Sequence, residues 1–236
     1  MSRFSYYPPI LGYHCVGPFR DDHVPTVSAE AFERQLAFIR RRRYRIVPVE
    51  TFAACLLERR PFPRRSLAIT FDDGYEETAS VAWPLLKRFE MPATVFITPM
   101  EIGRPGFLTW AQVEELAREG MDIGSHTMSH SYLPLVADDQ LAQELVSSKH
   151  TIEEHLGRPV RVLSYPVGGF TQQVQALAKQ AGYEAACTTN RVSTPNGRDP
   201  FALRRIKVTE IDANPWAFWA KLSGYYDAFR QLKAPS

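Results

Sequence analysis

Two adjacent carboxylates and a pair of histidines are the residues of this sequence best suited to chemistry. Asp72 and Asp73 directly follow the apolar run LAITF, and His126 and His130 are separated by three residues in SHTMSH. On a helical turn, residues four apart project to the same side, so both imidazoles can reach one metal ion. Two imidazoles and one carboxylate leave coordination positions open for water and substrate, as a catalytic metal requires. The second aspartate would then act as a general base. The structural alternative for the pair, a helix N-cap with an acidic first turn, accounts for only one of the two carboxylates.

The polar residues that follow predicted strands indicate where such a site would lie. His14 follows ILGY, Asp72 and Asp73 follow LAITF, and His126 follows MDIGS. In parallel α/β architectures, and above all in barrels, the carboxyl ends of the strands form the active face. The sequence therefore predicts that these side chains collect on one rim.

Apolar, β-branched runs alternate with longer amphipathic runs along the chain, which is typical of a mostly parallel sheet covered by helices. Strands are predicted over residues 10–14, 45–49, 67–71, 93–98, 121–125, 160–165, 184–189 and 205–208. Helices are predicted over residues 28–42, 50–59, 76–89, 110–119, 138–156 and 172–181, and an aromatic C-terminal helix over about 214–233. With no internal repeat or long linker, we expect one domain over residues 1–236, with a core of about 8–210.

Bulk composition excludes several classes of protein. The 236 residues carry a formal net charge of +2, which gives no reason to expect a nucleic-acid partner. Arginine clusters at residues 40–45 and 59–65 fit solvated helix ends, with an anionic membrane surface or acidic glycan as the alternative.

Three cysteines without CxxC spacing fit free thiols in a reducing compartment. Because no secretion signal or membrane-spanning run is seen, we expect a cytoplasmic protein, with peripheral membrane contact as an alternative and no indication of oligomeric state.

These residues resemble the polysaccharide deacetylases, also called NodB-homology domains or carbohydrate esterase family 4. TFDDG at residues 70–74 resembles the first motif of the family and SHTMSH at 125–130 the second, within a resemblance that runs from about ILGYHCV to LRRIKV. The resemblance implies a distorted (β/α)7 barrel that hydrolyses an N-acetyl group from an amino sugar, or less often an O-acetyl group. It also implies Asp72 as the base, and Asp73, His126 and His130 as ligands of one divalent metal ion, usually Zn²⁺ with Co²⁺, Ni²⁺ or Fe²⁺ as alternatives.

The later motifs of that family are altered in this chain. In LSYPVGGF, Ser164 stands where the family usually has an arginine, and Val167 stands where it has an aromatic residue. The Tyr165-Pro166 pair resembles the poly-N-acetylglucosamine deacetylase branch, in which LPRI is frequent near the end, and LRRI here places Arg205 at the matching position. The resemblance implies that Arg205 orients the base and that Tyr165, Pro166 and Val167 bind substrate, with the backbone N–H of Val167 near the oxyanion.

A general acid must come from elsewhere, because the tryptophan-bearing fourth motif and the late leucine-histidine motif are absent. LGYHCVG resembles the tyrosine-histidine motif that opens many chains of this branch, which implies His14 as the acid. Histidine is the side chain most easily tuned to donate a proton near neutral pH. The remaining histidines, His23, His150 and His155, show no partner spacing and are expected at the surface.

Taken together, the sequence predicts a metal-dependent hydrolase that removes N-acetyl groups from an amino-sugar-containing glycan or glycan precursor. Two alternatives stay open. One is a hydrolase of another N-acyl, O-acetyl or cyclic-imide substrate that uses the same metal chemistry. The other is a non-catalytic glycan-binding barrel, which the altered later motifs permit.

Overall fold

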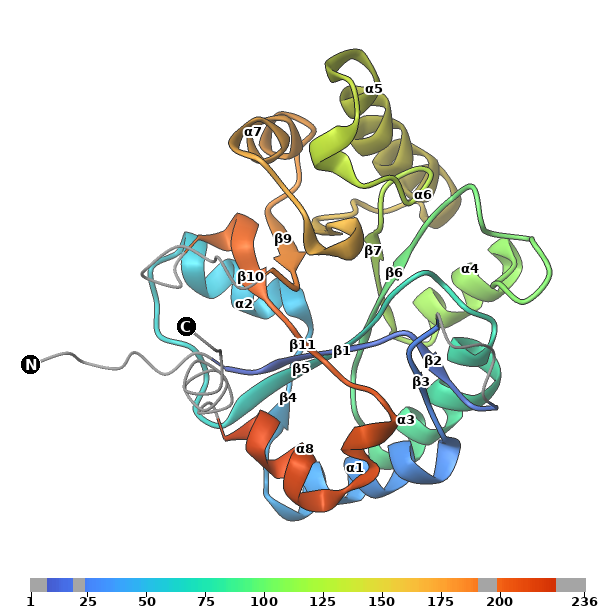
Figure 1. Cartoon of the computed structure of the whole chain (residues 1–236), viewed down its shortest axis with the longest axis vertical. Coiled ribbons are helices and arrows are strands. Elements are labelled where there is room, and N and C mark those ends of the chain that lie inside the picture. Colours follow the sequence, from blue (N-terminus) through green and yellow to red (C-terminus); the bar gives the residue numbers. More distant parts are fainter. Residues whose placement is uncertain (1–7, 19–23, 191–198, 224–236) are drawn as a thin grey trace, which may run out of the picture.

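The computed structural model describes residues 8–18, 24–190 and 199–223, so His23 and the predicted helical residues beyond 223 lie outside the described part (Figure 1). The strands are β1 Ile10–Tyr13, β2 Cys15–Val16, β3 Thr26–Val27, β4 Arg45–Ile46, β5 Ser66–Phe71, β6 Thr94–Ile97, β7 Asp122–Ser125, β8 Val162–Ser164, β9 Ala185–Thr188, β10 Leu203–Arg204 and β11 Ile206–Lys207. The helices are α1 Ala29–Arg41, α2 Val49–Leu57, α3 Trp83–Phe89, α4 Trp110–Arg118, α5 Asp138–Ala142, α6 Ser148–Leu156, α7 Gln172–Gln180 and α8 Pro215–Leu222. Two π-helical turns, Thr78–Ala82 and Gln143–Ser147, precede α3 and α6.

A parallel sheet closes on itself and is surrounded by helices (Figure 1). Its strand order is β10-β9-β8-β7-β6-β5-β1-β11, and β4 pairs with β5 outside this path. β10 pairs with β9 through Leu203 and Cys187, whereas β11 pairs with β1 through Ile206 and Leu11. Only Arg205 separates β10 from β11, so one short segment joins the two ends of the sheet. The structure thereby confirms the predicted distorted (β/α)7 barrel.

The interior of the barrel is filled by alternate residues of its strands, and most of them are small. The largest side chain that a strand contributes to this inner cluster is Phe96 of β6. Gly124 of β7 leaves the space for it, because a Cβ atom at Gly124 would lie 2.5 Å from the Phe96 ring. The guanidinium of Arg205 lies over the same ring, 5.3 Å from its centroid. The apolar filling therefore ends in a charged layer.

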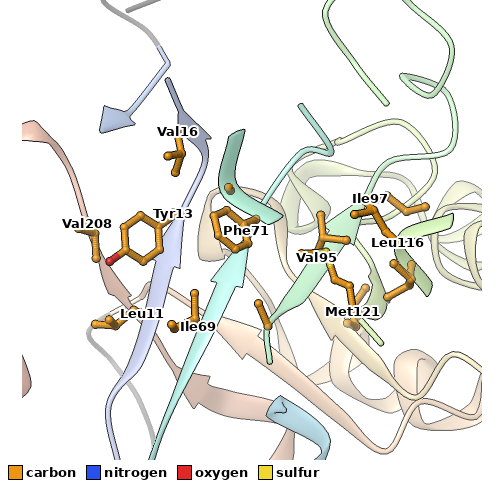
Figure 2. Packing of buried hydrophobic residues seen from close by; sticks show 14 of the residues in the cluster. Leu11, Tyr13, Val16, Ile69, Phe71, Val95, Ile97, Leu116, Met121 and Val208 are labelled. Carbon is orange, nitrogen blue, oxygen red and sulfur yellow. The ribbon is translucent and has the colours of Figure 1, made fainter. Parts of the chain in front are cut away.

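The opposite faces of the strands pack against the helices. Tyr13 of β1 and Phe71 of β5 stack at a centroid distance of 5.6 Å (Figure 2). Phe32 of α1 meets both rings edge-on. Aromatic pairs of this geometry add to the stabilisation that comes from burial alone. Tyr13 and Phe71 are also paired in register, so the next residues, His14 and Asp72, leave their strands at the same level.

Local signals explain most of the helix boundaries. The Ser28 side chain accepts the Ala31 N–H at the start of α1, and Thr109 forms a capping box with Gln112 before α4. Gly157 ends α6 in the left-handed conformation with φ of 61°. These local contacts account for the starts of α1 and α4 and for the end of α6.

Four predicted elements differ in detail from the structure. The strand predicted over residues 205–208 is two short strands joined at Arg205, and the strand predicted over 45–49 is limited to Arg45–Ile46. The helix predicted over 138–156 is interrupted by the π-helical turn Gln143–Ser147, and the predicted helix 76–89 contains the turn Thr78–Ala82. In the described part of the chain no helix has the length and apolar character needed to cross a membrane. Cys15, Cys55 and Cys187 are buried thiols.

Candidate active site

Asp72 lies at the mouth of the barrel, in a buried ion pair with Arg205. Its two carboxylate oxygens accept hydrogen bonds from Nη1 and Nη2 of Arg205, both at 2.6 Å. Each residue is only 3% exposed. Arg205 also donates to Thr70 Oγ1 at 3.1 Å and to Ser164 Oγ at 2.8 Å, so it is held on three sides. The guanidinium is thus fixed in a plane that matches the carboxylate.

The electrostatic surroundings keep Asp72 ionised. Burial alone would raise its pKa, but Arg205, followed by His126 and His14, lowers the pKa well below the usual range. A bidentate guanidinium that hydrogen-bonds the charged form is sufficient to outweigh desolvation. The carboxylate is therefore charged and immobile at neutral pH.

Asp73 faces away from Asp72, toward the two histidines. Asp73 has φ of 72° and Gly74 has φ of 79°, so the chain turns sharply where β5 ends. Aspartate tolerates this left-handed conformation better than most residues. Because of this turn, the two adjacent carboxylates face different groups. Asp72 points toward Arg205, and Asp73 points toward the two histidines.

Asp73, His126 and His130 form a cluster whose potential ligand atoms all lie within 4.8 Å of one another. Asp73 Oδ1 is 3.5 Å from His126 Nε2 and 3.3 Å from His130 Nε2. This oxygen is buried and has no hydrogen-bond partner among the described residues. Two nitrogens and one oxygen that converge in this way fit a divalent metal such as Zn²⁺. The orphaned oxygen supports this fit, because a buried polar atom without a partner is costly unless a ligand satisfies it.

Contacts outside the cluster prepare His126 for ligation. Its Nδ1 atom lies 2.7 Å from the backbone oxygen of Ser164, a contact that places the proton on Nδ1 and leaves the Nε2 lone pair facing Asp73. Burial lowers the pKa of His126, against the opposing effects of Asp72 and Asp73, so its ring is neutral. Asp73 raises the pKa of the more exposed His130. A proton on His130 therefore competes with a metal ion.

The conformation of residues 126–130 differs from the prediction. We expected the two histidines on a helical turn, but the segment is an irregular loop in which Thr127 and His130 have φ of 65° and 61°. The imidazole rings still meet, with centroids 4.9 Å apart. Their convergence thus results from a left-handed loop and not from helical periodicity.

His14 lies next to Asp72, as predicted for a strand-end histidine. Its Nε2 atom is 3.9 Å from Asp72 Oδ2, and its Nδ1 atom is buried without a hydrogen-bond partner in the described ranges. Burial lowers the pKa of His14, although Asp72 and Asp73 act in the opposite direction. The imidazole is therefore neutral near pH 7 and must take up a proton before it can donate one.

The three residues predicted to bind substrate differ in their exposure. Tyr165 is completely buried: its ring stacks on Phe170 and its hydroxyl donates to the Phe201 carbonyl at 3.1 Å. Pro166 is buried as well. Val167 is 73% exposed and has φ of 58°, which is unusual for a β-branched residue. Of the three, only Val167 is accessible to a substrate.

Thr70 and Ser164 are site residues that the sequence analysis did not assign. Thr70 lies two positions before Asp72 on the same face of β5, so strand periodicity provides a signal for it. Ser164 was noted only as a departure from a familiar motif. The Arg205 guanidinium lies against this small side chain and donates to it, so a large residue at position 164 would clash.

The chain is similar in sequence to known polysaccharide deacetylases. The family model described as polysaccharide deacetylase matches residues 59–186. YxkH of Bacillus subtilis is 29% identical over 201 residues, which make up 85% of this chain and 71% of YxkH. The poly-beta-1,6-N-acetyl-D-glucosamine N-deacetylase of Staphylococcus aureus is 23% identical over 200 residues, or 78% of this chain and 68% of that protein.

A solved structure has the same fold. The deacetylase PplD of Streptococcus pyogenes, in complex with acetate, superimposes with a TM-score of 0.83 at 23% sequence identity. The match covers 92% of this chain and 100% of that chain. The barrel and its closure at β10 and β11 therefore belong to an architecture already observed by experiment.

Proposed function

This chain belongs to the polysaccharide deacetylase family, and from that premise we propose that it is a metal-dependent hydrolase that removes N-acetyl groups from an amino-sugar-containing glycan or glycan precursor. One observation carries the proposal: a three-residue cluster suited to a metal ion lies beside a buried, ionised aspartate that is not part of the cluster. Amide hydrolysis requires both an electrophilic centre and a base in fixed positions.

Asp73, His126 and His130 would hold the metal ion. Zn²⁺ is the first choice for a site with two histidines and one carboxylate, and Co²⁺, Ni²⁺ or Fe²⁺ suit the same donors. When bound, a divalent metal polarises a carbonyl group and makes water more acidic. The remaining chemistry falls to the side chains around it.

Asp72 is the proposed base. It accepts a proton from the water molecule that attacks the acetamide carbon, while the guanidinium of Arg205 keeps the carboxylate oriented. Because the ion pair lowers the pKa of Asp72, the carboxylate is a weak base but is always ionised. The Asp72 carboxylate therefore contributes to the rate mainly through its fixed position next to the attacking water, because holding reacting groups in place itself lowers the activation barrier.

His14 is the proposed acid that protonates the amine as the C–N bond breaks. The imidazole is neutral in the free protein, so the proton has to come from the reaction itself. Asp72 Oδ2, 3.9 Å from His14 Nε2, is the nearest described acid that can supply it. In this scheme the proton removed from water reaches the amine through Asp72 and His14, and acetate and a free amine are released. Val167 presents its backbone at the rim and is the proposed donor to the oxyanion.

Metal content and acetate release together test this proposal. The metal content of the purified chain is measured after reconstitution with Zn²⁺ or Co²⁺ and compared with that of His126→Ala. His150→Ala is the control, because among the described residues His150 is exposed and its ion pair is with Glu154. We expect about one metal ion per chain in the wild type and the control, and a loss in His126→Ala. Acetate release is then measured on β-1,6-linked N-acetylglucosamine oligosaccharides, the glycan named for the Staphylococcus aureus relative.

Three results would change the assignment. A wild-type chain that binds neither ion after reconstitution would point to a glycan-binding barrel. A metal-loaded chain that cleaves O-acetylated sugars or cyclic imides but not N-acetylated sugars would move the assignment to those substrates. Equal acetate release by the wild type and His126→Ala would contradict the metal-dependent mechanism.

A further inference from the structure

The loop between the two histidines of the metal cluster holds a conformation that its own sequence does not favour. Thr127 and His130 both occupy the left-handed region, with φ of 65° and 61°. A non-glycine residue in this region is strained and persists only where its surroundings hold it there. Threonine is β-branched, so its left-handed conformation is a genuine outlier. Contacts from outside the loop must therefore stabilise it.

Glu144 makes three hydrogen bonds to this loop. Its carboxylate Oε2 accepts the Ser129 N–H at 3.0 Å, and its Oε1 accepts the Ser129 hydroxyl at 2.5 Å. Its backbone oxygen accepts the Met128 N–H at 3.1 Å. Both donors lie between His126 and His130, so Glu144 binds the centre of the segment that sets the separation of the two ligands. Hydrogen bonds to a charged acceptor are stronger than those between neutral groups.

A second chain of hydrogen bonds reaches the start of the loop from the neighbouring residue, Leu145. Its carbonyl oxygen accepts from Tyr183 Oη at 3.0 Å and from Ser148 Oγ at 3.3 Å. Ser148 Oγ lies 2.7 Å from Ser125 Oγ, which accepts the Thr127 N–H at 3.2 Å. The serines and Thr127 are completely buried, so these bonds are shielded from water.

Glu144 and Leu145 belong to the π-helical turn Gln143–Ser147 that joins α5 to α6. A π-helical turn is rare, because one extra residue widens the helix and weakens its hydrogen bonding, and such turns occur frequently at functional sites. Here the side chain and backbone oxygen of Glu144 bond to the loop directly, and the Leu145 carbonyl oxygen bonds to Ser148, which reaches the loop through Ser125. The loop is thus supported from the turn at both its first and its middle residues.

We propose that Glu144 is a positioning residue of the metal site, which fixes residues 127–129 so that His130 Nε2 stays opposite Asp73 Oδ1. The inference rests on the proposed function only in that the cluster binds a divalent metal ion. It assigns a role to the π-helical turn, which otherwise only destabilises the helix. Glu144 touches neither the metal ligands' ring nitrogens nor Asp72, so its effect must pass through the loop.

The first test is metal affinity measured without substrate. Co²⁺ and Zn²⁺ affinities are determined by chelator competition for the wild type, Glu144→Gln and Glu144→Ala. Glu154→Gln is the matched control, since Glu154 lies on α6, is exposed and pairs only with His150. Loss of a group that orients a ligand typically weakens metal binding about 10–100-fold. We expect that loss in both Glu144 variants and none in the control.

A double-mutant cycle with Ser129→Ala separates positioning from general stability. If Glu144 acts through the Ser129 hydroxyl, the double variant Glu144→Gln/Ser129→Ala binds metal only slightly more weakly than Glu144→Gln alone, because both changes affect the 2.5 Å contact between that hydroxyl and the carboxylate. The visible spectrum of bound Co²⁺ should change in the same variants, since it reports ligand geometry. The Gln and Ser129→Ala variants keep the test valid if Glu144→Ala does not fold.

The inference is overturned if folded Glu144→Gln and Ser129→Ala retain wild-type affinity and the wild-type Co²⁺ spectrum, even with lower stability toward urea. It is also overturned if the wild type binds neither ion. Because the readout needs no glycan, a chain that binds metal but releases no acetate refutes the proposed function and still gives a result here.

Discussion

Replacing Arg205 by methionine provides the strongest test of the buried ion pair. Methionine keeps the apolar stem of the arginine side chain but not its guanidinium, so Asp72 would lose both 2.6 Å hydrogen bonds. Removing one partner of a buried ion pair costs about 3–5 kcal/mol, because the other charge is left without compensation. For a domain of this size, each kcal/mol lowers the melting temperature by about 2–4 °C. The expected fall is therefore on the order of 6–20 °C.

The pH dependence of this loss follows from the pKa of Asp72. In the wild type that pKa is lowered on folding, so the ion pair contributes stability above the unfolded pKa of about 3.9 and loses it as the pH falls further. In Arg205→Met, burial is no longer opposed by the guanidinium and raises the pKa of Asp72 against the remaining effects of His126 and His14. The folded variant then binds a proton that the unfolded chain does not, so its stability falls as the pH rises. The difference between the two proteins should be largest at neutral pH and shrink on acidification.

Urea unfolding of the metal-free proteins at several pH values measures this difference. Arg161→Met is the control, since the Arg161–Glu184 pair at 3.2 Å is about half exposed and such pairs contribute no more than about 1 kcal/mol. In the loaded enzyme, the acidic limb of the kcat/KM profile should move to higher pH as the base becomes harder to ionise. A destabilisation below about 1 kcal/mol, or one that grows on acidification, would refute the reasoning.

Three further changes have definite expected outcomes. Asp72→Asn should retain the metal ion but lower acetate release at least about 100-fold, since the proposed base is removed and the ligands are not; equal rates would exclude Asp72 as the base. Burial, followed by Glu50, raises the pKa of Asp122 to about 7. Asp122→Asn should therefore stabilise the protein at about pH 8, with a gain that shrinks toward pH 4, as measured by urea unfolding; a gain independent of pH would contradict the shift. Gly124→Ala should destabilise by about 1–3 kcal/mol in thermal unfolding, because its methyl group would meet the Phe96 ring at 2.5 Å; an unchanged melting temperature would contradict the tight interior.

The positions of the charged residues were predictable because strand ends obey a simple rule. Asp72, Asp73 and His126 each follow a recognisable apolar strand, and parallel strands bring such residues to one edge. The meeting of Arg205 with Asp72 required a motif resemblance, since no local pattern pairs residues 133 positions apart. Burial of Tyr165 was missed, because a tyrosine beside a proline gives no sign of which way its ring points.

Other features depend on contacts that sequence periodicity does not contain. The π-helical turn Gln143–Ser147 lies in a run that reads as an ordinary helix, and its extra residue is explained only by Ser129, Ser148 and Tyr183. The left-handed Thr127 is similarly supported by the buried Ser125. Local propensities describe average behaviour, and both features arise where tertiary hydrogen bonds override it.

The segment that joins β10 to β11 has a consequence for protein synthesis. Leu11 of β1 pairs with Ile206 of β11, so β1 can pair with β11 only after nearly all of the described chain has been synthesised. During translation at about 5–20 residues per second, a nascent chain that ends before Leu203 has two unpaired sheet edges and an aspartate buried without its guanidinium. Truncated products that end before Arg205 lack the guanidinium, so the ion pair with Asp72 forms only late in synthesis. The barrel can therefore close only when the chain has been synthesised through β11.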